Sequence, residues 1–196
     1  IIMQILHNHR RMDCTGMTVN DGARLYTIHT ARKLQPGYFC FATTDEEYRI
    51  LRKIERVGQK ATLSGNARFA LGIVTGDNKK YITNVKTAEN EVILKGLDIH
   101  KFRYTAGDNY ITYQPELFQQ TAPVEYYRAR QKLLYRFICR RLVFAYDDRQ
   151  TLSLNSCNIL IPEIEGLDIK YVLAVLNSRV AQFYFEKCFQ TLKVLR

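Results

Sequence analysis

Apolar residues recur at helical spacing in two segments of the chain, residues 43–57 and residues 167–189. In the first, acids fill the first turn, and Thr43 or Thr44 is placed to cap it. In the second, Asp168 occupies the capping region. The pattern predicts a helix over each segment, the second being a long C-terminal helix. The apolar positions are Ile50, Leu51, Ile54 and Val57 in the first segment and Val172, Leu176, Val180 and Phe183 in the second.

Shorter segments are rich in β-branched and aromatic residues or alternate between apolar and polar positions, which is typical of strands. They comprise residues 23–32, 38–43, 67–76, 79–85, 140–148 and 156–162. We expect the last two to be strands joined by the turn around Asp147, Asp148 and Asn155. Because strands occupy the middle of the chain and helices lie near both ends, the order favours an α+β fold, a mixed sheet with flanking helices, over a doubly wound α/β sheet.

Residues 72–82 read GIVTGDNKKYI and raise the question of a phosphate-binding loop. A Walker A loop needs a Gly-Lys pair and a dinucleotide loop needs G-x-G-x-x-G, and neither is present. The pattern predicts instead a strand, a turn formed by Gly76, Asp77 and Asn78, and a returning strand. Lys79 and Lys80 at the tip of this hairpin suit phosphate contacts, although lysines at turns are also commonly just solvated.

The charge balance points to a polyanionic partner. Hydrophobic residues make up 46% of the chain, enough for a core, and 29 Lys and Arg against 19 Asp and Glu give a net charge of +10. A generic basic surface is compatible with the same composition. Within residues 126–149 arginines are interleaved with aromatic residues, which favours nucleic acid unless the aromatics are core and the arginines solvated. The cations of the first predicted helix and just beyond it fit a solvated face: Arg49, Arg52, Lys53, Arg56 and Lys60.

Residues that could carry catalysis do not form a recognisable set. The HNH tripeptide at 7–9 lacks a ββα-metal context, and the five cysteines are odd in number and without a C-x-x-C pair. The acidic segments 45–47, 146–148 and 162–165 suit a helix start, a strand end and a loop, and no G-x-S-x-G occurs. We therefore expect a binding module without catalytic, cofactor or metal residues. Reduced thiols favour the cytoplasm, and without an apolar run of about 18 residues we expect no membrane span.

Four segments, taken in order, carry a family resemblance. LGIVTGDNKKYI (71–82) is similar to G-I-x-T-G-x-N-x-x-[FY]-I, and ILKGLDIHKFRY (93–104) to L-x-G-x-D-I-x-x-[FY]. Residues 132–162 resemble K-[IL]-L-x-R followed by two strands, and residues 171–185 resemble [YL]-L-x-x-L-N-S-x-x-x-x-[FY]. These motifs resemble the TaqI-like C-terminal specificity domain, the target recognition domain of N6-adenine DNA methyltransferases and of Type IIG restriction–modification enzymes. The resemblance extends over roughly residues 48–190.

The resemblance implies that this chain recognises double-stranded DNA and that a methyltransferase domain of the same polypeptide carries out the reaction. That domain would bind S-adenosylmethionine, and Mg²⁺ where the parent enzyme also cleaves DNA, in the cytoplasm of a bacterium or archaeon. Its catalytic [ND]-P-P-[YF] motif is absent here, because the chain contains no Pro-Pro pair. We expect the target recognition domain to span residues 37–196 and to be truncated at its C-terminus. Residues 1–36 match poorly and are a linker or the end of a preceding domain.

The candidate DNA-contacting residues combine the turn of the first motif with the basic segments. Three other readings stay open: a specificity-subunit-like domain that docks a protein partner, an RNA-binding module, and an enzyme fragment with a nuclease or phosphotransferase site. The lack of an RNP-type aromatic motif counts against the second, and the lack of a visible ligand set counts against the third. The DNA candidates are Thr75, Asn78, Lys79, Lys80, Arg103, Lys132, Arg136, Arg140 and Arg149.

Overall fold

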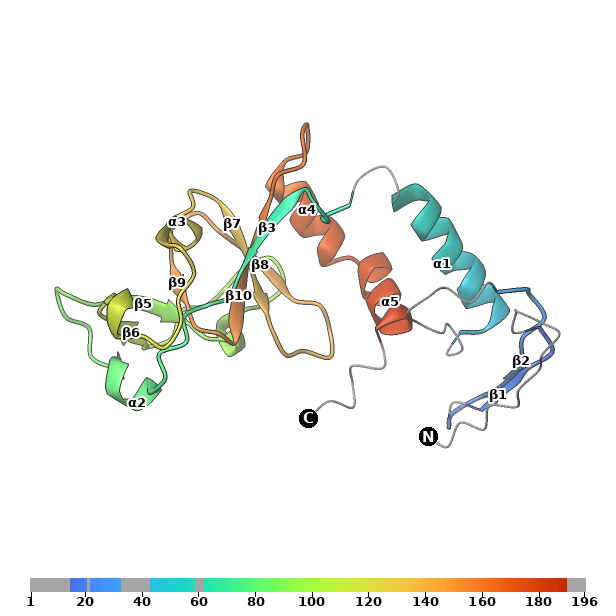
Figure 1. Ribbon diagram of the computed structural model, residues 1–196, viewed down its shortest axis with the longest axis horizontal. Coiled ribbons are helices and arrows are strands. Elements are labelled where there is room, and N and C mark those ends of the chain that lie inside the picture. The colour runs from blue at the N-terminus through green and yellow to red at the C-terminus, as the bar shows by residue number, and fades with distance from the viewer. Residues whose placement is uncertain (1–14, 21, 33–42, 59–61, 190–196) are drawn as a thin grey trace. The chain divides into compact units, whose positions relative to one another are not determined.

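The computed structural model describes residues 15–20, 22–32, 43–58 and 62–189. The chain divides into two compact units, one made of residues 1–60 with 183–196 and one of residues 61–182 (Figure 1). The expected boundary between residues 36 and 37 stays a prediction. Several features of the sequence lie outside the described residues: the HNH tripeptide, Cys14, Cys40, Lys60 and the strand expected at 38–43, apart from Thr43.

The first unit contains a short hairpin and a helix. Strands β1 (Thr18–Asn20) and β2 (Leu25–Thr27) pair antiparallel, so only part of the strand expected at 23–32 forms. Helix α1 (Asp45–Gly58) confirms the helix expected at 43–57. Thr44 and Glu47 close its N-terminus: the Thr44 hydroxyl accepts from the Glu47 N–H at 3.3 Å, and the Glu47 carboxylate accepts from the Thr44 N–H at 2.9 Å.

The second unit is built on two four-stranded sheets. The first sheet is wholly antiparallel, with strand order β3-β10-β7-β8. The two strands expected at 140–148 and 156–162 form as β8 and β10, but one turn does not join them. In the sheet, β7 lies between them, and in the sequence they are separated by β9. The strands are β3 (Ala67–Ala70), β7 (Lys132–Arg136), β8 (Phe144–Asp147) and β10 (Cys157–Pro162).

The second sheet has strand order β4-β6-β5-β9 and is mixed, since β5 and β9 run parallel. Together with the helices, this confirms the α+β fold with a mixed sheet. Its strands are β4 (Ile82–Thr83), β5 (Glu91–Leu94), β6 (Tyr110–Ile111) and β9 (Leu152–Ser153). Short helical turns connect the strands: α2 (Asn78–Tyr81), η1 (Gly96–Asp98), η2 (Pro115–Leu117) and α3 (Val124–Tyr127).

Alternation along β7 and β10 explains the layers of the second unit. Leu134 and Ile159 join a buried cluster that also takes Ile93 from the second sheet. Their sequence neighbours Leu133 and Leu160 join a different cluster with residues of helix α4 (Ile169–Leu176). Successive side chains of a strand point to opposite faces, so both faces of the first sheet are buried, one against the second sheet and one against α4.

The C-terminal helical prediction is confirmed, but as two helices, α4 and α5 (Arg179–Cys188). Asn177 ends α4, and its side chain accepts from the Phe144 N–H at 3.1 Å and donates to the Phe144 carbonyl at 2.9 Å. These two bonds satisfy the backbone of β8 at the edge of the first sheet, where no further strand pairs. The Ser178 hydroxyl accepts from the Ala181 N–H at 3.1 Å and so starts α5.

The prediction of a hairpin over residues 72–82 is wrong. Ile73 and Val74 make isolated bridges to Leu154 and Gln120, and the chain then turns into α2. The Asp77 carboxylate accepts hydrogen bonds from the Lys79 and Lys80 N–H groups, at 3.0 and 3.3 Å. It therefore caps a helical turn, where the sequence predicted a hairpin turn. Of the strand expected at 79–85, only Ile82–Thr83 forms.

Two glycines of this segment are required by geometry. A Cβ at Gly72 would lie 2.1 Å from the Leu154 carbonyl oxygen, so the two backbones meet where no side chain fits. Gly76 adopts φ +82°, the left-handed region that favours glycine. The G-I-x-T-G motif therefore has a structural explanation at both of its glycines. In the part of the chain that the structure describes, no helix is long and apolar enough to cross a membrane.

Candidate nucleic-acid interface

The turn at 75–80 presents two lysines to solvent. Thr75 is buried, and its hydroxyl donates to the Asn78 side-chain oxygen at 2.6 Å. With the Asp77 cap, this bond fixes the turn. Lys79 and Lys80 are exposed, and the Lys80 ammonium lies 4.9 Å from the centre of the Tyr81 ring. Thr75 therefore supports the turn, and the two lysines are the groups that can reach a phosphate.

The loop at 100–103 presents an aromatic ring beside a cation. Phe102 has φ +73° although it is not glycine, and its side chain is 53% exposed. Its N–H donates to the Phe144 carbonyl at 2.8 Å and its carbonyl accepts from the Tyr146 N–H at 3.3 Å, so β8 holds the strained backbone in place. Arg103 is exposed and makes no side-chain hydrogen bond or ion pair with the described residues.

A strained residue with a solvent-facing ring is typical of a functional position, because strain of order 1–3 kcal/mol persists only where the surroundings impose it. Sequence reasoning missed Phe102. The signal was the aromatic position that ends the L-x-G-x-D-I-x-x-[FY] motif, at which Phe102 stands.

The loop between β7 and β8 also exposes apolar side chains beside cations. Phe137 and Ile138 are exposed, the latter at 84%, and Arg140 and Arg141 follow. The Gln182 side chain accepts from the Leu142 N–H at 2.8 Å and anchors the end of the loop. Apolar side chains held in solvent beside arginines favour a contact surface over a plain turn. Ile138 was also missed, because an isolated isoleucine near a strand is read as core.

Arg136 ties these two loops to the same part of the fold. Its guanidinium donates to the carbonyl oxygens of Gly96 at 2.8 Å and Ile99 at 2.9 Å. It therefore holds the start of the 100–103 loop against β7. Arg136 was a candidate for reading a base, but it is half-buried and two of its donor nitrogens bind backbone carbonyls, whereas Arg103 and Arg140 are exposed.

The prediction that Lys132 contacts DNA is wrong. It is fully buried, and its ammonium pairs with the Asp147 carboxylate at 2.5 Å and donates to the Tyr127 carbonyl at 2.7 Å. Burial by itself would raise the pKa of Asp147, but Lys132, Tyr104 and Thr151 together hold it below its usual value. The interior position of this pair leaves Lys132 no access to DNA.

The same carboxylate shapes the turn after β8. It accepts from the Arg149 N–H at 3.2 Å and from the Thr151 N–H at 3.0 Å, and Gln150 adopts φ +57°. Arg149 is exposed at this turn. The buried ion pair thus positions one of the predicted DNA contacts without touching DNA itself.

The candidates fall on different parts of the second unit. Lys79 and Lys80 precede β4 of the second sheet, whereas Arg103, Arg140 and Arg149 lie beside β8 of the first sheet. The three arginines therefore border one strand of the first sheet, and the two lysines lie on the turn that leads into the second sheet.

No cluster of three His, Cys, Asp or Glu that could hold a metal occurs among the residues that the structure describes. Cys139 and Cys157 are free thiols, and burial raises the pKa of the Cys157 thiol far above its usual value, which makes it inert.

Comparison with known proteins defines the class. The sequence model of the TaqI-like C-terminal specificity domain matches residues 91–195, more than half of the chain. This chain therefore belongs to the TaqI-like C-terminal specificity domain family, which confirms the resemblance seen in the sequence. It is a specificity domain of the kind that recognises DNA in methyltransferase-type enzymes. A search of curated proteins found no match.

The matched segment places the loops within the family's domain. It begins at β5 and includes the 100–103 loop, the β7–β8 loop, the turn at Arg149 and both C-terminal helices. The turn at 75–80 and helix α1 lie before it.

Proposed function

We propose that this chain is the target recognition domain of a restriction–modification enzyme and reads a specific base sequence in duplex DNA. The methyltransferase that it serves transfers a methyl group to adenine N6 and is a further domain of the same polypeptide. The observations that carry the proposal are the exposed Arg103, Arg140 and Arg149 on segments that border β8 and the exposed Phe102 and Ile138, all within a specificity domain.

The division of labour follows from the reaction. An adenine inside a duplex is out of reach of a methyl donor, so it is flipped out of the stack into the catalytic pocket. The recognition domain selects the site before this happens. Lys79 and Lys80 bind phosphates and set the register, while Arg103, Arg140 and Arg149 reach base edges, where a guanidinium pairs with guanine through two hydrogen bonds.

The cofactors belong to the other domain. S-adenosylmethionine is bound there, with Mg²⁺ where the enzyme also cleaves DNA as Type IIG enzymes do, and the enzyme works in the cytoplasm. No residue of this chain is assigned to either ligand.

The test is binding to duplex DNA, measured by fluorescence anisotropy at low salt with the preferred sequence selected from a random pool. Arg103→Ala and Arg140→Ala should each cost about 1–3 kcal/mol at one base position and relax the preference there. Lys79→Ala should weaken binding to all duplex sequences equally and lower the slope of log K against log salt by about 1. The exposed Arg130, replaced by Ala, is the control for a lost charge.

The result that contradicts the proposal is equal binding to selected and scrambled duplexes by the enzyme that contains this chain, unchanged by these substitutions. A preference for single-stranded RNA would support the RNA-binding alternative. Binding to a partner subunit without any DNA binding would support a docking domain.

A further inference from the structure

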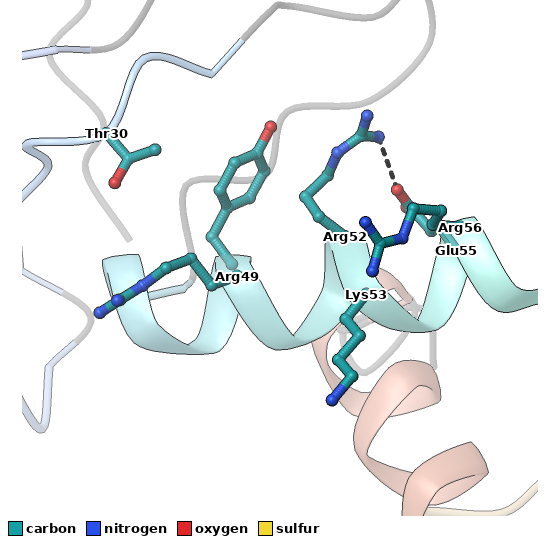
Figure 2. A pocket seen from close by; sticks show the side chains of 7 residues that line it. Thr30, Arg49, Arg52, Lys53, Glu55 and Arg56 are labelled. Atoms are coloured by element: carbon teal, nitrogen blue, oxygen red, sulfur yellow. Dashed lines mark hydrogen bonds and ion pairs between the residues drawn. The ribbon is translucent and has the colours of Figure 1, made fainter.

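Helix α1 carries a row of cations that the loops of the specificity domain do not explain. Arg49, Arg52, Lys53 and Arg56 follow one another at steps of three, one and three residues, so they share one face of the helix. Figure 2 shows their side chains along this face. With Thr30, Tyr48 and Glu55 they line an open hollow of about 480 Å³. We call these four cations the α1 stripe.

The acids in the first turn of the helix make no ion pair with the stripe. Asp45 accepts from Arg32 at 3.0 Å, and Glu47 pairs with Arg24 at 3.0 Å and with Lys187 at 2.7 Å. Both carboxylates are therefore used away from the stripe. Glu46 lies one turn before Arg49 and does not line the hollow.

Within the stripe, one acid offsets one of the four cations. Glu55 pairs with Arg52 at 2.7 Å, as the dashed line in Figure 2 marks. Arg49, Lys53 and Arg56 make no ion pair with any described residue; the Arg49 Nε donates only to the Asp45 carbonyl, at 3.4 Å. The hollow therefore carries an excess of positive charge.

The arrangement works against the stability of the helix. Arg49 and Lys53, and likewise Arg52 and Arg56, are like charges four residues apart, which destabilises a helix. A helix optimised for its own stability would pair acids with bases four residues apart along this face. An anionic ligand bound along the stripe would relieve the repulsion between these like charges.

We propose that the α1 stripe binds the phosphate backbone of duplex DNA without reading sequence, a contact made in addition to that of the recognition loops. With a rise of about 1.5 Å per residue, Arg49 and Arg56 are about 10 Å apart along the helix, a length over which duplex DNA carries about six phosphate charges. The guanidinium fork of arginine matches phosphate oxygens. This inference deepens the proposed function and rests on it for the choice of DNA as the polyanion.

The experiment measures binding of the full chain to a random-sequence duplex by fluorescence anisotropy between 50 and 200 mM salt, a range over which the Debye length falls from about 14 to 7 Å. In the variant Arg49→Gln/Lys53→Gln/Arg56→Gln the slope of log K against log salt should fall by about 2.7, since each phosphate contact contributes about 0.9. Over this range the wild-type chain should lose roughly 40-fold more affinity than the variant. The substitution to Gln keeps a good helix former, and circular dichroism checks that α1 persists.

Two controls separate a phosphate contact from net charge. The charge-conserving variant Arg49→Lys/Lys53→Arg/Arg56→Lys should keep most of the slope. Lys53→Gln and Arg130→Gln each remove one exposed cation, and only Lys53→Gln should lower the slope. An unchanged slope in the triple variant, or an equal change from Arg130→Gln, would overturn the proposal, as would tighter binding to duplex RNA of the same length.

Failure of the stripe and failure of the proposed function give different results. The triple variant should select the same preferred sequence from a random duplex pool as the wild-type chain. If the stripe is not a contact, this selection persists and the slope is unchanged in the variant. If the recognition function is wrong, no sequence is selected, while the slope still falls in the variant.

Discussion

At the scale of single residues, the charge of a side chain did not predict which cations are exposed and able to contact DNA. Lys132 and Arg136 lie in the same basic, aromatic segment as Arg140. The first is buried in an ion pair and the second holds two backbone carbonyls, while the third is exposed. What separates them is strand position: Lys132 and Arg136 lie on β7, between two other strands, and Arg140 lies in the loop that follows it.

Replacing Lys132 should destabilise the fold. Lys132→Met leaves the Asp147 carboxylate buried without its counter-ion, and breaking a buried pair from one side costs about 3–5 kcal/mol. Urea denaturation measures the free energy of unfolding, and Arg130→Met on the surface should change it by less than about 0.5 kcal/mol. Equal effects of the two substitutions would show that Lys132 is not buried as described.

Gly72 should tolerate no side chain. Gly72→Ala places a Cβ against the backbone of Leu154, where nothing can move aside cheaply, and we expect a loss of about 3 kcal/mol or more. Gly166→Ala is the matched control: φ is +74° there, but a Cβ would have nothing within 4 Å, so only the backbone cost of about 1–2 kcal/mol remains. The prediction fails if thermal unfolding ranks the two variants in the opposite order.

The stability of the first unit should depend on Asp45 at low pH. Burial by itself would raise the pKa of Asp45, but hydrogen bonds from the His29 and Thr30 N–H groups and from Arg32 lower it from 3.8 to about 2. A lowered folded-state pKa stabilises the fold above the unfolded value, and this stabilisation is lost as the pH falls from about 4 to 2.

Asp45→Asn removes that dependence. The variant should be less stable than the wild-type chain at pH 6 and should approach it near pH 2, as followed by chemical denaturation across this range. Parallel pH curves for the two proteins would contradict the assignment.

At the scale of elements, helix periodicity predicted where helices form but not where one stops. The spacing of apolar residues continues through Asn177, yet the chain breaks into α4 and α5 there. The reason is tertiary, because the Asn177 side chain satisfies the backbone of β8. The hairpin expected at 72–82 failed similarly, because Asp77 caps a helical turn where a two-residue turn was expected.

Asn177→Ala should therefore weaken the contact between α4 and the first sheet. It leaves a buried N–H at Phe144 without its partner, which costs about 1–3 kcal/mol. Hydrogen exchange should show faster exchange of the Phe144 amide, and urea denaturation should show the loss in stability. Ser178→Ala, which touches the start of α5 only, should leave the Phe144 amide protected.

At the scale of the whole molecule, the chain joins a sheet-rich unit that carries the recognition loops to a unit with a basic helix. The family match covers most of the former and assigns it to DNA recognition. The proposed division of function leaves catalysis to residues outside this chain, and that division can be tested directly.

S-adenosylmethionine should not bind this chain. The chain has no Pro-Pro pair and hence no [ND]-P-P-[YF] motif. At a concentration 100 times its Kd, a ligand stabilises a protein by about 2.7 kcal/mol, so a millimolar cofactor with a Kd near 10 µM would visibly raise the melting temperature. We expect no shift in thermal unfolding and no heat in calorimetry; saturable binding would mean that part of a cofactor site lies here.

The sequence by itself determined the fold class, helix α1 with its capping box, several strands and the family, since these depend on local periodicity and on motifs read in order. Only the tertiary structure decided that Lys132 is interior, that Asn177 divides the C-terminal helix, and that Phe102 faces solvent in a strained conformation. Each of these depends on a partner distant in sequence, Asp147 for Lys132 and Phe144 for the other two. Local pattern carries no information about which distant residue satisfies a charge or a backbone group, so pairing of this kind appears only when the chain is folded.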